Sequence, residues 1–347
     1  MVASAGATAS LSVELRVHVS VGLQSSKGGT FMRFSVIPAL MICMLPAVNS
    51  HPARAAANEA FLGRWDITIP AEGKSRARYC WLEATIEGGT LKGRFNPGGG
   101  AVFPLPEITV ENDELRFQHP VGRLEDKLAA VYRARLVGGK LEGTATFGKE
   151  PPRKLTGVRG PKWPTGTQKK KPGTPVDLFN GKDMSGWLGQ NSGKATGWSV
   201  EDGLMVNEDR ADNIYTEKKF RDFKLEVEFN VAPKSNSGIY LRGRYEIQII
   251  DGEGRPRDIH SQGALYGFIV PAVDVDKKAG EWQKFEITLV ANRVTVILNG
   301  TKIIDDGEVP GITGSALDAS ESDPGPIMLQ GDHGPVKFRK VQLTPLE

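Results

Sequence analysis

Short runs of β-forming residues, each closed by glycine, proline or asparagine, constrain most strongly what this chain can fold into. The 347 residues include 41 glycines and 22 prolines, which separate segments rich in Val, Ile, Thr, Phe and Tyr. Residues 223–231 show the pattern clearly, because apolar side chains alternate there with Lys, Glu and Asn. A period of two is typical of a strand with one buried and one wet face. Amphipathic helical periods are scarce, so we predict an all-β protein.

Two β units and a linker are expected after the N-terminal segment. Residues 56–159 contain eight strand candidates separated by turn signals, for which we predict a small antiparallel barrel or sandwich. A Gly-x-Trp sequence at residues 63–65 is similar to the start of lipocalin-like barrels. Residues 160–175 are rich in Pro, Gly, Thr and Lys, as expected of a linker. Residues 176–347 are predicted to form two packed sheets and to fold on their own.

The first 55 residues contain the features of an export signal. Arg33 precedes an apolar run at residues 34–48, and a small-residue cleavage site follows at residues 53–55. Two prolines interrupt the apolar run, which is also too short to span a bilayer comfortably. We therefore expect an upstream segment and a cleaved signal peptide, no stable membrane span, and a periplasmic, cell-envelope or extracellular protein.

Composition and missing motifs exclude several functional classes. The chain has 44 basic and 41 acidic residues, which leaves no broad basic field for a nucleic acid. Cys80 is the one cysteine left after cleavage, so no internal disulfide and no cysteine-based metal site is expected. The sequence has no Gly-x-Ser-x-Gly elbow, Walker loop, dinucleotide fingerprint or His-Glu-x-x-His motif.

Polar residues along two neighbouring predicted strands indicate a ligand-binding sheet face. Glu246 and Gln248 share one face of the run at residues 245–251, because side chains alternate in an extended chain. Tyr240 and Arg242 share a face of the preceding run in the same way. The alternative is an ordinary solvated strand face, in which Arg242 is a structural partner of Glu246.

Residues outside these strands add further candidates. His333 lies in a glycine-rich loop beside Asp332, and histidine titrates near neutrality, although a lone histidine is more often structural. Asp251 begins a turn-like Asp-Gly-Glu-Gly sequence. Asp251 or Glu253 is alternatively an oxygen ligand for a divalent cation, but EF-hand spacing is absent. The metal site is thus unknown, and a divalent cation is left open as a cofactor.

Seven ordered segments give the second unit a family resemblance. Residues 176–347 resemble the 3-keto-disaccharide hydrolase family, formerly a domain of unknown function, in the stretches at residues 178–187, 237–243, 245–251, 263–267, 279–282, 298–300 and 329–339. The resemblance implies a concanavalin-like jelly roll and a carbohydrate substrate. The expected substrate-binding residues are Tyr240, Gln248, Gln330, Lys277 and Asp251. The family has proline after the lysine, where this chain has Lys278.

The resemblance also implies a chemistry, namely cleavage of 3-keto-glycosides by a hydrolase or lyase. The C3 ketone acidifies the C2 proton, so that a base can remove it and the enolate can expel the C1 substituent. Glu246 and His333 are expected to be base and acid in either order, with Arg242 or a bound cation stabilising the enolate. The alternative function is a lectin-like, non-catalytic glycan-binding protein of the envelope, since the same fold class hosts both.

Overall fold

A computed structural model describes residues 58–121, 128–166, 169–191, 195–252 and 254–347. Nearly all regular structure in these ranges is β, and one helical turn occupies residues 58–61. The predicted export signal and its cleavage site lie outside the described residues. Within the described ranges, no helix has the length and apolar character needed to span a membrane.

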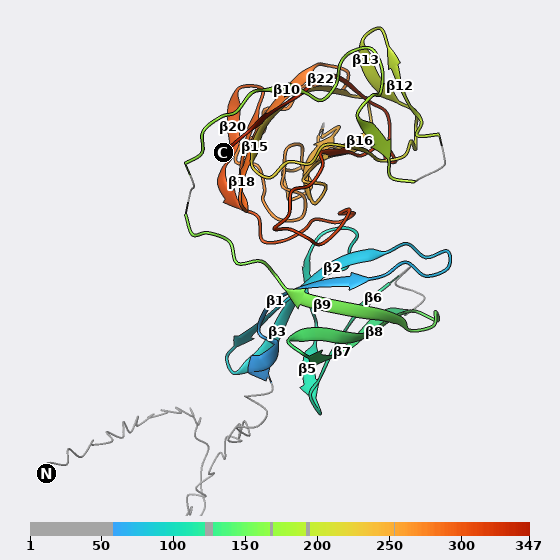
Figure 1. The fold of residues 1–347 in the computed structure, drawn as a ribbon, viewed down its shortest axis with the longest axis vertical. Coiled ribbons are helices and arrows are strands. Elements are labelled where there is room, and N and C mark those ends of the chain that lie inside the picture. The colour runs from blue at the N-terminus through green and yellow to red at the C-terminus, as the bar shows by residue number, and fades with distance from the viewer. Residues whose placement is uncertain (1–57, 122–127, 167–168, 192–194, 253) are drawn as a thin grey trace, which may run out of the picture. The chain divides into compact units, whose positions relative to one another are not determined.

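The first group of strands, coloured blue to green in Figure 1, forms one antiparallel sheet. Its order is β4-β3-β2-β1-β9-β8-β7-β6-β5, so consecutive strands pair except β4 and β5, and β1 pairs with β9. This up-and-down order is typical of small antiparallel barrels, whereas a lipocalin relationship stays a prediction. The nine strands, one more than the sequence candidates, are β1 (Gly63–Ile69), β2 (Arg78–Glu87), β3 (Thr90–Asn96), β4 (Phe103–Pro104), β5 (Ile108–Glu111), β6 (Glu114–Pro120), β7 (Ala129–Val137), β8 (Lys140–Phe147) and β9 (Arg153–Arg159).

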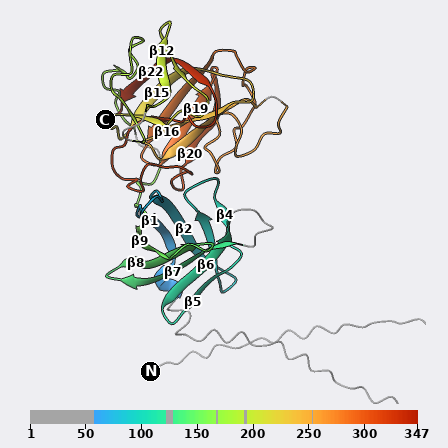
Figure 2. The same cartoon turned by 90° about the vertical axis from the view of Figure 1, so that its right-hand side faces the viewer.

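The second group of strands, coloured green to red, forms two sheets (Figures 1 and 2). The larger sheet has the order β12-β13-β22-β15-β18-β19-β20, with β10 paired to β22, and the five-stranded sheet has the order β11-β14-β21-β16-β17. The strands are β10 (Val176–Asp177), β11 (Trp187–Gly189), β12 (Trp198–Glu201), β13 (Leu204–Asn207), β14 (Ile214–Thr216), β15 (Phe223–Val231), β16 (Asn236–Leu241), β17 (Tyr245–Ile250), β18 (Gln283–Val290), β19 (Arg293–Leu298), β20 (Thr301–Glu308), β21 (Met328–Leu329) and β22 (Val336–Pro345).

One apolar core lies between the two sheets of the second domain. Leu225 and Val227 of β15 pack in the same buried cluster as Ile247 and Ile249 of β17. Because side chains alternate along a strand, the even-numbered residues of β17 must point away from this core. The predicted jelly-roll sandwich is therefore confirmed, and its five-stranded sheet has a second face that the core does not use.

The two β groups belong to one compact unit, residues 50–347. Trp81 of β2 is buried in the core cluster of the second domain, and its indole nitrogen donates a hydrogen bond to the Ile312 carbonyl, 2.9 Å away. The Asn96 side-chain amide donates to the same carbonyl at 2.9 Å. The segment near Ile312 is thus held by both domains, and the independent folding of residues 176–347 stays a prediction.

Candidate active site

The unused face of the five-stranded sheet carries the polar residues predicted from the sequence. Strands β16 and β17 pair so that Tyr240 lies opposite Glu246 and Gly238 lies opposite Gln248. Directly opposed residues of antiparallel strands project to the same side. Tyr240, Glu246 and Gln248 therefore share the face that points away from the core, as their alternation predicts.

Two hydrogen bonds and the small size of a neighbouring glycine fix the position of Glu246. Its Oε2 accepts a hydrogen bond of 2.9 Å from the Tyr240 hydroxyl, and its backbone N–H donates one of 3.0 Å to Thr313 Oγ1. Gly238 supplies the space, because a Cβ atom there would lie only 2.4 Å from Glu246 Oε1. The carboxyl group thus has one defined position above the sheet.

Burial dominates the electrostatics of this carboxyl group. Glu246 is only 4% exposed, and desolvation raises its pKa to about 8, although the Tyr240 hydrogen bond and the positive field of His333 act in the opposite direction. Burial also raises the pKa of Tyr240 well above its usual value, so the phenol keeps its proton. A carboxyl group that changes charge near pH 8 has the properties of a general base or acid at physiological pH.

Two amide oxygens beside Glu246 have no hydrogen-bond partner among the described residues. They are the Oε1 atoms of Gln248 and Gln330, whose side chains are 1% and 5% exposed. The backbone N–H of Gln330 donates to the Gly238 carbonyl at 3.0 Å, which places Gln330 next to the row formed by Gly238 and Gln248. Buried polar atoms are normally paired, so these two acceptors are suited to the hydroxyl groups of a ligand.

An exposed aspartate–histidine pair lies at the margin of the same sheet. His333 Nδ1 and Asp332 Oδ1 are 2.6 Å apart, and both side chains are about half exposed. The His333 carbonyl accepts a hydrogen bond from the Asn236 N–H, so the loop is attached to the start of β16. Hydrogen bonding to Asp332 raises the pKa of His333, and the field of Glu246 adds to this effect.

Comparison with known proteins identifies the family of the second domain. Residues 174–344 match the profile of the 3-keto-alpha-glucoside-1,2-lyase-like domain. This segment belongs to that family. A relative named 3-keto-disaccharide hydrolase, from Bacteroides thetaiotaomicron, is 25% identical over 167 residues, which cover 38% of this chain and 57% of the relative.

The lyase-like domain is also similar to solved structures. One is a predicted glycosyl hydrolase from Parabacteroides distasonis ATCC 8503, with 27% identity, a TM-score of 0.43 and coverage of 53% of this chain and 93% of that chain. A second such protein from the same organism has 25% identity, a TM-score of 0.44 and coverage of 50% and 94%. The chain spans little more than half the length of the curated relative that it matches.

Arg242 of the lyase-like domain does not lie where the alternation predicts. Strand β16 ends at Leu241, and Arg242 has a φ of 54°, which breaks the period of two that placed it beside Tyr240. Its buried guanidinium donates to Asp222 Oδ1 at 3.0 Å and to the Ala291 carbonyl at 2.9 Å. Arg242 therefore forms a structural ion pair, and its partner is Asp222, not Glu246. We leave Arg242 out of the proposed site.

Lys277 and Asp251 lie apart from the Glu246 carboxyl group. Lys277 Nζ donates to the Trp282 carbonyl at 2.9 Å, and Asp251 Oδ2 accepts from the Lys234 N–H at 2.8 Å. This contact joins Asp251 to the turn before β16, 17 residues away in the sequence. Glu253 lies outside the described residues. Among those that the structure does describe, no group of three or more His, Cys, Asp or Glu residues is arranged to hold a metal ion.

A further segment, distant in the sequence, contacts the site residues of β16 and β17. Thr313 binds the backbone of Glu246, and Ser315 hydrogen-bonds with the Tyr240 side chain. Burial raises the pKa of Tyr266, as does the field of Glu246, which places Tyr266 near the carboxyl group as well. Thr313 lies 67 residues beyond Glu246 in an irregular segment, so no local pattern connects the two.

Proposed function

We propose that the lyase-like domain cleaves 3-keto-glycosides by removing the C2 proton and expelling the C1 substituent. One observation carries this proposal: the buried Glu246 carboxyl group lies on a sheet face beside unpartnered amide acceptors and within the field of an exposed aspartate–histidine pair. The names of the family and of the relative from Bacteroides thetaiotaomicron support the substrate class.

The reaction needs a base and an acid at different positions. Loss of the C2 proton places its electron pair in an enolate with the C3 carbonyl. The ketone then re-forms, a C1–C2 double bond appears and the C1–O bond breaks, so the leaving oxygen requires a proton. Addition of water across C1–C2 gives net hydrolysis. This route avoids an oxocarbenium ion, so the two-carboxylate rule of ordinary glycosidases does not apply.

Glu246 fits the role of the base in this scheme. Its burial makes the ionised carboxylate more basic than an ordinary glutamate, and Tyr240 fixes one of its oxygens. Gln248 and Gln330 are placed to accept hydrogen bonds from sugar hydroxyl groups. The keto-sugar ring would therefore lie over the row formed by Tyr240, Glu246 and Gln248.

His333 fits the role of the acid. Its hydrogen bond to Asp332 keeps the imidazole protonated to higher pH, and its exposed position leaves room for a departing group. Because the guanidinium of Arg242 is occupied elsewhere, we assign the enolate oxygen to no side chain. Assays should therefore be run with and without an added divalent cation.

The leaving group separates the two roles experimentally. A 3-keto-glucoside of 4-nitrophenol needs little help from an acid, whereas the methyl 3-keto-glucoside needs a proton on its leaving oxygen. We expect Glu246→Gln to lower kcat by ~10²- to 10⁴-fold on both substrates. His333→Ala should lower kcat strongly on the methyl glycoside and only slightly on the nitrophenyl glycoside. Glu217→Gln, at an exposed glutamate, is the matched control for the first variant.

The pH profile gives a second check on the assignment. With the nitrophenyl glycoside, activity should rise as pH increases through about 8, because only ionised Glu246 can accept the C2 proton. Activity that falls over the same interval would assign the protonated form of Glu246 to catalysis. Near-full activity in both Glu246→Gln and His333→Ala would refute the proposed site.

A glycan-binding function without chemistry is the second candidate, favoured by the same unpartnered amides of Gln248 and Gln330. It would be supported if the protein binds unoxidised disaccharides and gives no product from either keto-glycoside, with or without a cation.

Export is a separate proposal supported by residues 33–55, and intact-mass analysis of the exported protein should show a start near Ala56.

A further inference from the structure

An irregular segment, residues 309–316, contacts both the first β domain (strands β1 to β9) and the proposed catalytic site, and we call it the bridging segment. The Val309 N–H donates to the Asn292 carbonyl at 2.7 Å. Just past the other end, the Leu317 N–H donates to the Gly243 carbonyl at 2.8 Å. The lyase-like domain therefore holds both ends of the bridging segment.

One side of the bridging segment fixes the carboxyl group of the site. Thr313 Oγ1 accepts the hydrogen bond of 3.0 Å from the Glu246 N–H, and the Thr313 N–H donates to the Arg244 carbonyl at 2.9 Å. Ser315 hydrogen-bonds with the Tyr240 side chain, whose hydroxyl donates to Glu246 Oε2 at 2.9 Å. The position of the bridging segment thus affects both the backbone and the side chain of Glu246.

The first β domain holds the other side of the bridging segment. The indole nitrogen of Trp81 and the side-chain amide of Asn96 both donate to the Ile312 carbonyl, each at 2.9 Å. The Gly98 carbonyl accepts a hydrogen bond of 3.1 Å from the Ser315 N–H, and Asn96 Oδ1 accepts one of 2.8 Å from the Gly98 N–H. Asn96 therefore holds the segment both directly and through Gly98.

The contact between the bridging segment and the first β domain is close and dry. A Cβ atom on Gly314 would lie 2.6 Å from the Gly100 nitrogen, so the two backbones touch. Trp81 and Asn96 are both 0% exposed, and Trp81 packs in the same apolar cluster as Ile312. Because a buried donor without an acceptor costs free energy, the segment has one preferred position against these two side chains.

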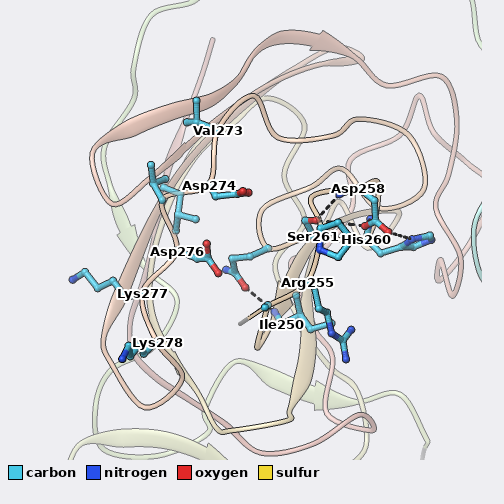
Figure 3. Close-up of a pocket in the computed structure, with 16 residues that line it drawn as sticks. Ile250, Arg255, Asp258, His260, Ser261, Val273, Asp274, Asp276, Lys277 and Lys278 are labelled. Atoms are coloured by element: carbon cyan, nitrogen blue, oxygen red, sulfur yellow. Dashed lines mark hydrogen bonds and ion pairs between the residues drawn. The ribbon is translucent and has the colours of Figure 1, made fainter.

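Another segment near Glu246 is supported within the lyase-like domain. The Tyr266 N–H donates to the Glu246 carbonyl at 3.0 Å, and the His260 ring lies edge-on to the Tyr266 ring, with centroids 5.0 Å apart. Figure 3 shows Asp258 beside His260 and Ser261, and Asp258 Oδ1 accepts a hydrogen bond of 2.7 Å from the His260 N–H. This side of the site thus has hydrogen bonds of its own, whereas the middle of the bridging segment is bonded to the first domain.

We propose that Trp81 and Asn96 of the first β domain are positioning residues for catalysis, because they hold the bridging segment that fixes Glu246. The inference rests on the proposed function, which makes Glu246 the base. Without these donors, the Ile312 carbonyl turns to water and the segment moves, so that water reaches the carboxyl group. Solvation favours the ionised form, so the pKa of Glu246 falls from about 8 toward its ordinary value of 4.5.

A change in the first domain leaves the charges around Glu246 intact. Among the described residues, the titratable groups whose charges act on this carboxyl group all belong to the lyase-like domain, and they are Tyr240, Tyr266, Asp332 and His333. A shift in the titration of Glu246 therefore reports a change in its solvation.

The test uses variants of the full chain. Asn96→Ala removes one donor to Ile312 and the acceptor of the Gly98 N–H, and Trp81→Phe removes the other donor but keeps an aromatic ring in the core. With the nitrophenyl 3-keto-glucoside, each should lower kcat by about tenfold and leave KM unchanged, because the base is weaker and no sugar contact is lost. The midpoint of the pH profile should move down by at least about one unit from its parent value near 8.

Trp65→Phe is the matched control for Trp81→Phe. The Trp65 indole is also 0% exposed, and it donates at 2.8 Å to the Phe61 carbonyl within the first domain. Leu115→Ala, in the core of the same domain, controls for the stability lost in Asn96→Ala. Both controls should lower Tm and leave kcat and the pH midpoint at their parent values.

An unchanged midpoint in Asn96→Ala, or an equal shift in the two controls, would overturn the proposal. If Asn96→Ala does not fold, Trp81→Phe decides by the same criterion.

A measurement without turnover separates this proposal from the proposed function. In urea unfolding, the stability that Glu246→Gln gains between pH 4 and pH 9 should be smaller when Asn96→Ala is also present, because a carboxyl group with a lower folded-state pKa loses less stability as pH rises. If the parent protein cleaves neither keto-glycoside, the proposed function fails, and this comparison alone decides whether the first domain positions Glu246. A smaller gain supports that role, and an equal gain refutes it.

Discussion

Replacing Glu246 with glutamine should make the protein more stable at high pH. In the unfolded chain this carboxyl group ionises near its ordinary value of 4.5, whereas in the fold burial raises its pKa to about 8. Between these values the folded state binds more protons than the unfolded state, so stability falls as pH rises. The loss begins near pH 4.5 and is complete above about pH 8. Glutamine carries no charge, so the variant does not lose this stability as pH rises.

The expected size follows from the two pKa values. A change of one pH unit across this interval corresponds to ~1.4 kcal/mol, so the gap between 4.5 and about 8 corresponds to about 5 kcal/mol. The side chain is 4% exposed, and solvent screening therefore reduces this little. For a domain of this size, the difference amounts to an increase of about 10–20 °C in Tm for the variant relative to the parent at high pH.

Urea unfolding followed by tryptophan fluorescence at pH 4, 6 and 9 would measure the effect. The difference in unfolding free energy between Glu246→Gln and the parent should grow steadily in favour of the variant across that range. Glu217→Gln should show no such growth, because its side chain is exposed. A difference that is constant with pH would show that Glu246 ionises normally in the fold, and the electrostatic basis of the proposed site would fail.

Other changes test the surroundings of the site. Gly238→Ala should lower kcat at least tenfold by displacing the Glu246 carboxyl group, whereas Gly99→Ala, at a position with open space, should have no effect on steady-state rates. Arg242→Lys should lower the free energy of unfolding by about 2–4 kcal/mol and leave KM unchanged, because lysine cannot make both buried hydrogen bonds of the guanidinium group. A raised KM at unchanged stability would instead assign Arg242 to the substrate site. Residues 176–347 produced alone should unfold cooperatively in calorimetry, but at a lower temperature than in the full chain, because Trp81 no longer fills their core. A fragment with no cooperative transition would refute the domain boundary.

Local alternation predicts the part of the site that lies within regular strands. Tyr240, Glu246 and Gln248 project as expected because β16 and β17 keep a strict period of two. Arg242 departs from the prediction because Arg242 and Gly243, with φ of 54° and 67°, form a turn that ends β16 and reverses the chain. The sequence gives no sign of that reversal at an arginine, since such φ values favour glycine or asparagine.

The sequence alone does not predict contacts between segments that are far apart along the chain. The Thr313 contact with β17 spans 67 residues. Gln262 Oε1 likewise accepts a hydrogen bond from the Ile250 N–H, which lies on a different segment of the chain. The sequence singles out His333 and Gln330 because a glycine-rich loop beside a strand is a local feature. The overall fold class was predictable for the same reason, since short punctuated strands are visible without knowledge of their partners.

The outer edge of β17 is closed by the chain segment that follows Gln262. The N–H of Gln248 donates to the Ala264 carbonyl, Gly263 donates back to Gln248, and Tyr266 donates to the Glu246 carbonyl. An uncovered edge strand invites pairing with other molecules, so these bonds protect the protein from aggregation. During divergence from related proteins, the backbone of this segment is therefore constrained by solubility, whatever side chains it carries.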